Sequence, residues 1–275
     1  MIKREKAKHT SGYRTGSVYK QSPPQNRILI GIPMTGLLRS EWCLARYGQI
    51  IPCNWSHNEF IQWIDQYSPI NFTVADARNI IVKKCIEGNY EWLMFIDHDV
   101  VLPPNFLVLM NEYMVGGKVP VVSGLYFTKS KPSEPLVYRG RGTGYYANWK
   151  IGDKVETDCV PMGCTLIHSS IIKAMYEESQ DYGIAGQSVK QVFLTPSRSF
   201  WDAETRAFNT QTGTEDMELC SRIMREGIFK KAGWPEYQGK KNPFLVDTRM
   251  FCFHIDWNGD KYPMFGEQVR FIRKK

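Results

Sequence analysis

The sequence contains no long hydrophobic run. None of its apolar stretches approaches the roughly 18–20 residues that a membrane-spanning helix needs. The first residues also lack the apolar segment of a secretory signal peptide. We therefore expect a soluble, intracellular protein of the cytoplasm without a transmembrane segment.

Paired cysteine motifs, repeats and linkers are absent as well. The seven cysteines are an odd number and form no C-x-x-C pair, so the sequence indicates neither a complete disulfide framework nor a zinc knuckle. We expect reduced thiols, most of them buried. The chain has no internal repeat and no segment that would separate two independent domains.

Excess charge is missing from most of the chain. The formal net charge is +7, and residues 1–27 hold seven cations and one acid, a net of +6. The nearly neutral remainder argues against a basic DNA-binding fold. Residues 1–26 contain too few large apolar side chains to pack, which predicts a flexible basic arm ahead of one domain over residues 27–275.

What the chain does contain is an alternation of apolar runs and amphipathic segments, in a composition that is 43% apolar. Continuous apolar runs predict buried strands over residues 28–32, 92–96 and 119–123. Amphipathic spacing and helix-boundary residues predict helices after Ser40 and over residues 76–87, 103–114, 169–177 and 215–225. Short strands are also expected around Leu136 and Tyr146. This alternation predicts an α/β fold with a mixed, mainly parallel sheet flanked by helices.

Two carboxylates, Asp97 and Asp99, directly follow the strand predicted over residues 92–96. Ligands of open α/β sheets bind at the carboxyl ends of the strands, and where the chain turns both carboxylates can approach one cation. A D-x-D string by itself is more often an accident on a solvated turn. Its interpretation therefore depends on the motifs that accompany it.

Two such motifs are present. Residues 73–82 read Thr-Val-Ala-Asp-Ala-Arg-Asn-Ile-Ile-Val, and residues 213–216 read Gly-Thr-Glu-Asp at the start of a predicted helix. Together with Asp97-His98-Asp99 they resemble the GT-A glycosyltransferases of the family 2 type, over roughly residues 28–254. The resemblance implies the GT-A (nucleotide-diphospho-sugar transferase) fold and a hexosyltransferase that moves a sugar from a nucleotide diphosphate, most often a UDP-sugar, to a hydroxyl with inversion.

The same resemblance implies roles for individual residues. The implied donor-binding residues are Pro33, Thr35, Asp76, Arg78, Asn79, Asp97, Gly163, Trp201 and Asp202. The implied metal ligands are Asp97, Asp99 and His254, a set of oxygen and nitrogen donors that suits Mn²⁺ or Mg²⁺. A carboxylate must also take the proton of the acceptor hydroxyl, and Asp216 is the first choice of base with Glu215 second.

Each of these residues also has a structural interpretation. Arg78 would then be a surface cation of an amphipathic helix, and His254 a hydrogen-bonded core residue. Glu215 and Asp216 would only favour the positive end of a helix. Gly163 and Trp201 would serve packing.

Other functions remain open at the level of sequence. They are a retaining enzyme of the same fold, a nucleotidyltransferase of related fold, and a non-catalytic module that binds a polyanion. A nucleotidyltransferase would usually have a glycine-rich, basic loop after the first strand, where residues 32–40 offer only Gly36 and Arg39. The basic arm, with the cations and aromatics of residues 126–150, is compatible with an acceptor on modified nucleic acid or an anionic glycan.

Overall fold

The computed structural model describes residues 27–52, 64–140, 144–204 and 206–272. The predicted basic arm, residues 1–26, lies outside the described residues. Side chains of several hairpin residues, Asp202 among them, also lie outside the described part.

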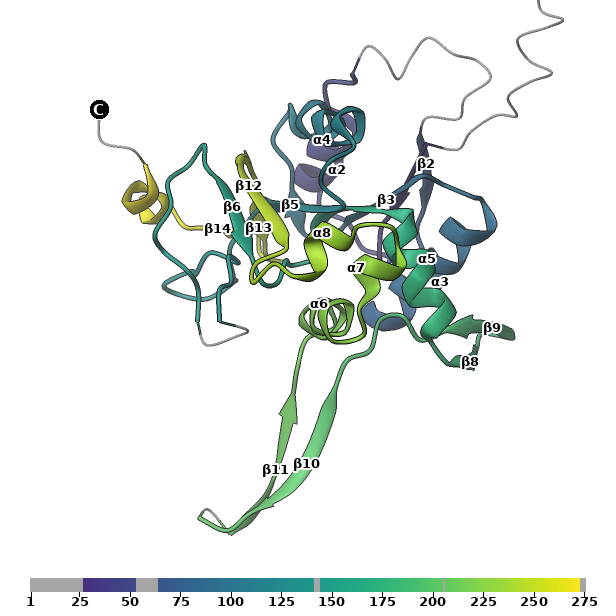
Figure 1. Ribbon diagram of the computed structural model, residues 1–275. Helices are drawn as coiled ribbons and strands as arrows, with labels where there is room; N and C mark the ends of the chain where they lie inside the picture. The colour runs from purple at the N-terminus through teal and green to yellow at the C-terminus, as the bar shows by residue number, and fades with distance from the viewer. Residues whose placement is uncertain (1–26, 53–63, 141–143, 205, 273–275) are drawn as a thin grey trace, which may run out of the picture.

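A seven-stranded sheet forms the centre of the molecule, in the order β2-β1-β3-β7-β5-β12-β6 (Figure 1). Its strands are β1 (Ile28–Gly31), β2 (Ile64–Tyr67), β3 (Trp92–Ile96), β5 (Val121–Leu125), β6 (Lys154–Thr157), β7 (Cys164–His168) and β12 (Phe244–Phe251). Strand β7 runs antiparallel to both β3 and β5, and β6 runs antiparallel to β12. The other strands share one direction, so the predicted α/β class with a mixed, mainly parallel sheet flanked by helices is confirmed.

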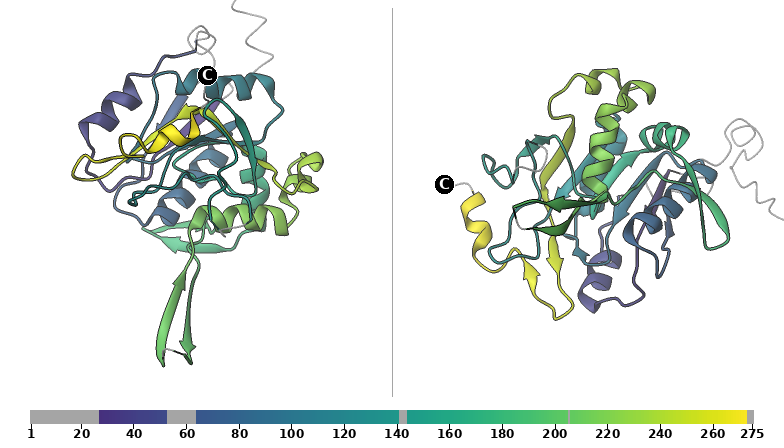
Figure 2. Two further views of the ribbon diagram at one scale, coloured as in Figure 1. Left: turned by 90° about the vertical axis from the view of Figure 1, so that its left-hand side faces the viewer. Right: turned by 90° about the horizontal axis from the view of Figure 1, so that it is seen from below.

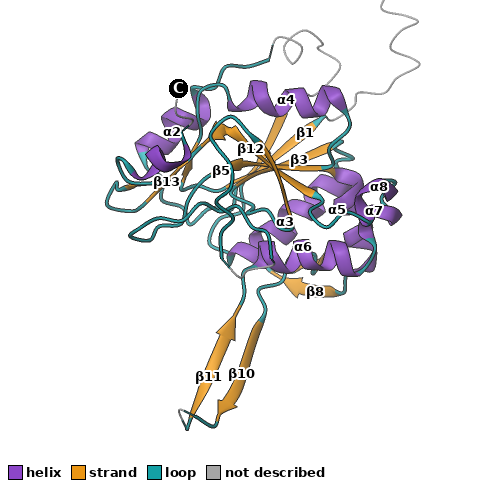
Figure 3. Ribbon diagram, turned by 60° about the vertical axis from the view of Figure 1, so that its left-hand side comes forward, coloured by secondary structure: helices purple, strands orange, loops and turns teal. Residues whose placement is uncertain are grey.

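Helices cover both faces of this sheet (Figures 1 and 3). One face carries α2 (Ser40–Tyr47) and α4 (Phe106–Gly116), and the other carries α3 (Val74–Glu87), α5 (Ser169–Glu178), α6 (Glu215–Arg225), α7 (Ile228–Lys231) and α8 (Pro235–Gln238). Alternate residues of β3 enter two different cores: Leu93 packs with α3 and α5, and Met94 packs with α4. A strand buried on both faces is apolar throughout, which is why the run over residues 92–96 is unbroken.

Most predicted elements are confirmed, with shifted ends. Helix α3 begins two residues earlier than predicted, because the side chain of Thr73 accepts a hydrogen bond from the amide of Asp76 and caps it. The strands predicted around Leu136 and Tyr146 are wrong, since that segment forms only isolated bridges. Its aromatic residues pack as an irregular layer instead, with Trp149 stacked on Phe271 at 4.2 Å between ring centres.

Smaller sheets complete the fold. Strands β4 (Val100–Val101), β13 (Phe253–Ile255) and β14 (Lys261–Tyr262) form one of them, β8 (Asp181–Ile184) pairs with β9 (Gln187–Lys190), and η2 (Glu267–Phe271) follows. The hairpin of β10 (Ser197–Asp202) and β11 (Ala207–Thr212) projects away from the body (Figure 2). Within the described ranges, no helix combines the length and apolarity needed to cross a membrane. Five of the six described cysteines are buried, as predicted.

Candidate active site

Arg78 joins the three motifs that the sequence analysis singled out. Its side chain is only 2% exposed, and its Nη2 donates to both carboxylate oxygens of Asp97, at 3.0 and 2.9 Å. Its Nη1 donates to the carboxylate of Glu215. Helix α3, the exit of β3 and the first turn of α6 therefore meet at one guanidinium, and Arg78 is not the surface cation of the alternative interpretation.

The ionisable groups around Arg78 shift the pKa values of one another. Burial opposes the charged form of Arg78, but the carboxylates of Asp97, Glu215 and Asp216 raise its pKa above the usual value. Burial raises the pKa of Glu215, against the attraction of Arg78 and with the repulsion of Asp216 added. Burial also raises the pKa of Tyr126, and the charges of Asp97 and Asp216 add to the effect. The field of Asp216 therefore reaches the centre of this cluster.

A short strand pairing places His254 beside Asp99. Strand β4 begins directly after Asp99 and pairs antiparallel with β13, so that His254 lies opposite Val100. The amide of Ile255 donates to the carbonyl of Asp99 at 2.8 Å. The result is a separation of 3.4 Å between Nε2 of His254 and Oδ2 of Asp99.

The backbone fixes which nitrogen of His254 faces the carboxylate. Nδ1 lies 2.9 Å from the carbonyl oxygen of Phe127, which can only accept, so Nδ1 carries the hydrogen. In the neutral ring Nε2 then directs a lone pair toward Asp99, the usual arrangement of a metal-binding histidine. The charged ring carries a hydrogen on Nε2 as well and can donate it to Asp99.

Lys129 supplies a cation at the same oxygen. Its Nζ lies 2.7 Å from Oδ2 of Asp99. Burial would raise the pKa of Asp99, but His254 and Lys129 lower it below its usual value. Asp97, the third predicted metal ligand, is held by Arg78 instead, and among the described residues no three His, Cys, Asp or Glu side chains gather into a metal site. Of the three predicted metal ligands, the structure thus brings two close together, Asp99 and His254.

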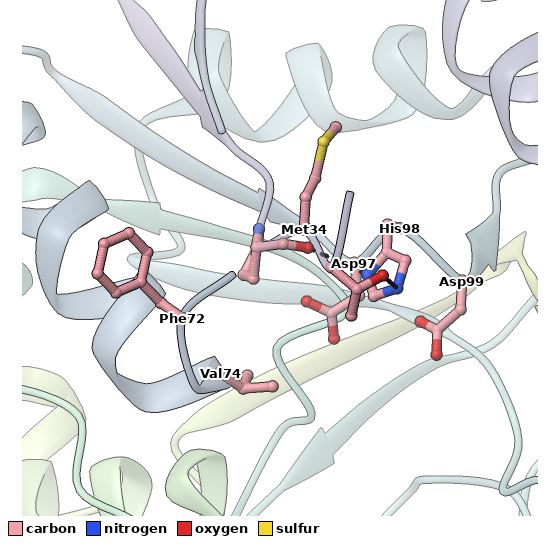
Figure 4. A pocket seen from close by; sticks show the side chains of 8 residues that line it. Met34, Phe72, Val74, Asp97, His98 and Asp99 are labelled. Carbon is pink, nitrogen blue, oxygen red and sulfur yellow. Dashed lines mark hydrogen bonds between the residues drawn. The ribbon is translucent and has the colours of Figure 1, made fainter. Parts of the chain in front are cut away.

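The loop after β1 forms a cavity beside this cluster. His98 holds the loop, with Nδ1 3.1 Å from the carbonyl oxygen of Pro33 and Nε2 3.3 Å from Oγ1 of Thr35. Figure 4 shows Asp97, His98 and Asp99 across the pocket from Phe72 and Val74. The cavity has a volume of about 90 Å³ and is lined by Pro33, Met34, Thr35, Phe72, Val74, Asp97, His98 and Asp99.

A wider groove of about 530 Å³ opens from the same place. It shares Thr35, His98 and Asp99 with the first cavity and is otherwise lined by Leu37, Leu38, Arg39, Lys129, Ile255, Asp256 and Trp257. Leu37 and Trp257 are 85% and 84% exposed. Asp99 therefore lies where a small cavity meets a larger groove with an apolar rim.

Two predicted donor-binding residues contact the protein instead of these cavities. Asn79 is 1% exposed and exchanges two hydrogen bonds with the backbone of Phe193, at 2.9 and 2.7 Å. Asp76 accepts from Oγ1 of Thr73 and from the hydroxyl of Tyr182, both at 2.7 Å. Both residues fasten neighbouring segments to α3 and line neither cavity, and their approach to a base and ribose stays a prediction.

The remaining predicted residues have separate positions. Gly163 accepts a hydrogen bond from the amide of Asp97 at 2.9 Å, and a Cβ there would lie 2.6 Å from the hydroxyl oxygen of Tyr126. Gly163 thus allows close packing at the exit of β3. Trp201 is 56% exposed on the projecting hairpin and lines neither cavity. The side chain of Asp202 lies outside the described part of the chain.

Sequence reasoning missed the contribution of the segment after β5. Tyr126 packs edge to face on His254, the carbonyl of Phe127 holds that imidazole, and Lys129 binds Asp99. These residues follow the carboxyl end of a predicted strand, which is a signal that could have marked them. The acceptor rim expected from residues 126–150 is corrected in part, because Tyr126 and Trp149 are buried.

Comparison with known proteins gives distant structural likenesses. The sequence matches no protein-family model and no curated protein. The structure is similar to A197 from STIV, with 18% identity and a TM-score of 0.48 over 84% of this chain and 86% of that one. It is also similar to S. aureus TarS in complex with UDP-GlcNAc, with 10% identity and a TM-score of 0.33 over 54% of this chain and 46% of that one. Likenesses of this size assign no function.

Proposed function

We propose that this chain is a metal-dependent glycosyltransferase of the GT-A type. It would transfer a sugar from a nucleotide-diphosphate donor, a UDP-sugar, to an acceptor hydroxyl. The configuration of the anomeric carbon would be inverted. The observation that supports this best is the meeting of residues 73–82, 97–99 and 213–216 around the buried guanidinium of Arg78. Three motifs that are far apart in sequence thus converge at the carboxyl ends of the parallel strands, where ligands of open α/β sheets bind.

The donor would bind at the carboxyl ends of the parallel strands. Pro33 and Thr35 line the cavity there, and His98 holds their loop in place. Asp97 is oriented by Arg78, and its backbone is fixed by hydrogen bonds with Gly163 and the indole of Trp42. Groups held from several sides can orient a bound nucleotide without further rearrangement.

Asp99 and His254 would hold the divalent cation, Mn²⁺ or Mg²⁺. When bound, the cation neutralises the charge that develops on the departing nucleotide diphosphate. The carbonyl of Phe127 keeps Nε2 of His254 directed at Asp99. Nitrogen ligation favours Mn²⁺ over Mg²⁺.

Asp216 is the proposed general base, because Glu215 is already bound to Arg78. Its carboxylate would take the proton of the acceptor hydroxyl as that oxygen bonds to the anomeric carbon. The bond between the anomeric carbon and the diphosphate oxygen breaks in the same step, and the electron pair leaves with the nucleotide. Glu215 would instead hold Arg78, and through it Asp97, in position.

Asp216→Asn tests this assignment. We expect the turnover number to fall by about 10²–10⁴-fold, because the amide cannot accept the proton, while donor affinity changes little. Single-turnover kinetics and calorimetric titration with UDP measure the two effects separately. Glu218→Gln is the matched control, since Glu218 lies in the same turn of α6 and pairs with Arg225 at 3.5 Å. Equal losses of turnover and donor binding would assign Asp216 to the nucleotide.

His254→Gln tests the second metal ligand. We expect Mn²⁺ affinity to fall about 10–100-fold, with part of the transfer activity restored by excess Mn²⁺. Metal titrations of the variant and the parent protein, followed by the paramagnetic signal of free Mn²⁺, give this directly. Titrations that superimpose would make His254 a core residue only.

The acceptor is proposed from charge alone. A hydroxyl on modified nucleic acid or on an anionic glycan would be attracted by residues 1–26, which lie outside the described residues. Such attraction weakens steeply with salt. Assays on both acceptor classes at low and moderate salt would show whether the arm contributes.

A further inference from the structure

Lys129 occupies the position in which the proposed cation would be needed. Its Nζ and Nε2 of His254 approach the same oxygen of Asp99, at 2.7 and 3.4 Å. The proposed metal must bind this oxygen or its immediate neighbour. A lysine ammonium and a divalent cation repel each other strongly at such distances, so both cannot stay on Asp99.

Hydrogen bonds of Thr128 hold the loop that carries Lys129, while the Lys129 side chain extends over the groove to Asp99. Oγ1 of Thr128 accepts from the amide of Glu134 at 2.9 Å and bonds Oγ of Ser130 at 2.6 Å. The amide of Thr128 donates to the carbonyl of Glu134 at 2.9 Å. The Lys129 side chain is 30% exposed and lines the wider groove with Asp99. A four-carbon stem on a fixed backbone can turn its ammonium into that groove.

We infer that Lys129 is an exchangeable cation of the donor site. It neutralises Asp99 when no donor is bound, and it turns to the diphosphate of the donor when a divalent cation takes Asp99. The inference rests on the proposed function, because it requires Asp99 to bind the cation and the groove beside it to receive a diphosphate.

This exchange couples the binding of the divalent cation to the binding of the donor diphosphate. A cation that binds alone must displace Lys129 and leave the ammonium without a partner. A diphosphate that arrives with the cation provides that partner, so each ligand raises the affinity for the other. The chain would thus resist binding free metal and bind the metal together with the nucleotide.

Lys129→Met should change the affinities for Mn²⁺ and for UDP in opposite directions. Without nucleotide, we expect Mn²⁺ to bind about fivefold more tightly, since its competitor is gone. At saturating Mn²⁺, we expect UDP to bind about tenfold more weakly, since a charged hydrogen bond to phosphate is lost. The paramagnetic signal of free Mn²⁺ measures the first constant and calorimetry the second.

Lys131→Met is the matched control. Lys131 lies on the same loop, is 61% exposed and pairs with Asp260 at 3.7 Å, so both constants should equal those of the parent protein. Unchanged constants in Lys129→Met, or weaker binding of both ligands, would overturn the inference. Tighter Mn²⁺ binding with unchanged UDP binding would also overturn it, because Lys129 would then be only a surface ion pair. A parent protein that binds UDP equally with and without Mn²⁺ would refute the proposed metal site itself, and the inference with it.

Discussion

Replacing Asp99 by Asn is expected to reduce sugar transfer at least about a thousandfold and to leave the fold intact. The amide keeps the shape of the side chain but loses the charge that the cation requires. Asp99 is 29% exposed and belongs to neither hydrophobic core, so its replacement disturbs no core packing. Initial rates with saturating UDP-sugar and Mn²⁺, beside thermal melting of both proteins, measure the two effects.

Asp181→Asn is the control for this loss of charge. Asp181 lies on β8 with 66% of its side chain exposed and pairs with Lys190 at 3.6 Å. Its replacement should leave transfer unchanged. Transfer by Asp99→Asn at the parental rate in saturating Mn²⁺ would contradict the assignment of Asp99 to the metal.

Replacing Arg78 by Met is expected to lower the free energy of unfolding by about 3 kcal/mol, which for a chain of this size is a melting temperature about 6–12 °C lower. The variant removes the partner of two carboxylates, Asp97 and Glu215, which are only 22% and 15% exposed. Their partial exposure puts the expected loss at the low end of what a broken buried pair costs. Denaturant unfolding measures it.

Lys84→Met separates this effect from the loss of any cation on α3. Lys84 is exposed on the same helix, so its replacement should change the free energy of unfolding by less than about 0.5 kcal/mol. We also expect Arg78→Met to abolish donor binding under conditions where it is folded, because Asp97 loses the group that orients it. A stable variant that binds UDP like the parent would show that Arg78 is not the centre of the site.

The local sequence was sufficient to predict the strands that are completely buried. The run over residues 92–96 had to be a strand buried on both faces, and the acidic pair had to lie at its exit. The strands predicted around Leu136 and Tyr146 were wrong, and both of these residues are only half-buried. The chain there forms isolated bridges, and Trp149 in the same segment stacks on Phe271, a contact that the local sequence does not indicate.

Residue types and local spacing thus determined the α/β class and the position of Asp97 and Asp99 at a strand exit. Tertiary structure alone decided what those groups contact. Asn79 follows Arg78 directly, yet one binds the backbone of Phe193 and the other the carboxylate of Asp97. Successive helical residues face directions about 100° apart, and only the packing of α3 sets which direction meets the site. Lys129 reaches Asp99 because β5 and β3 deliver their ends to the same edge of the sheet, a proximity that depends on strand order and not on sequence spacing.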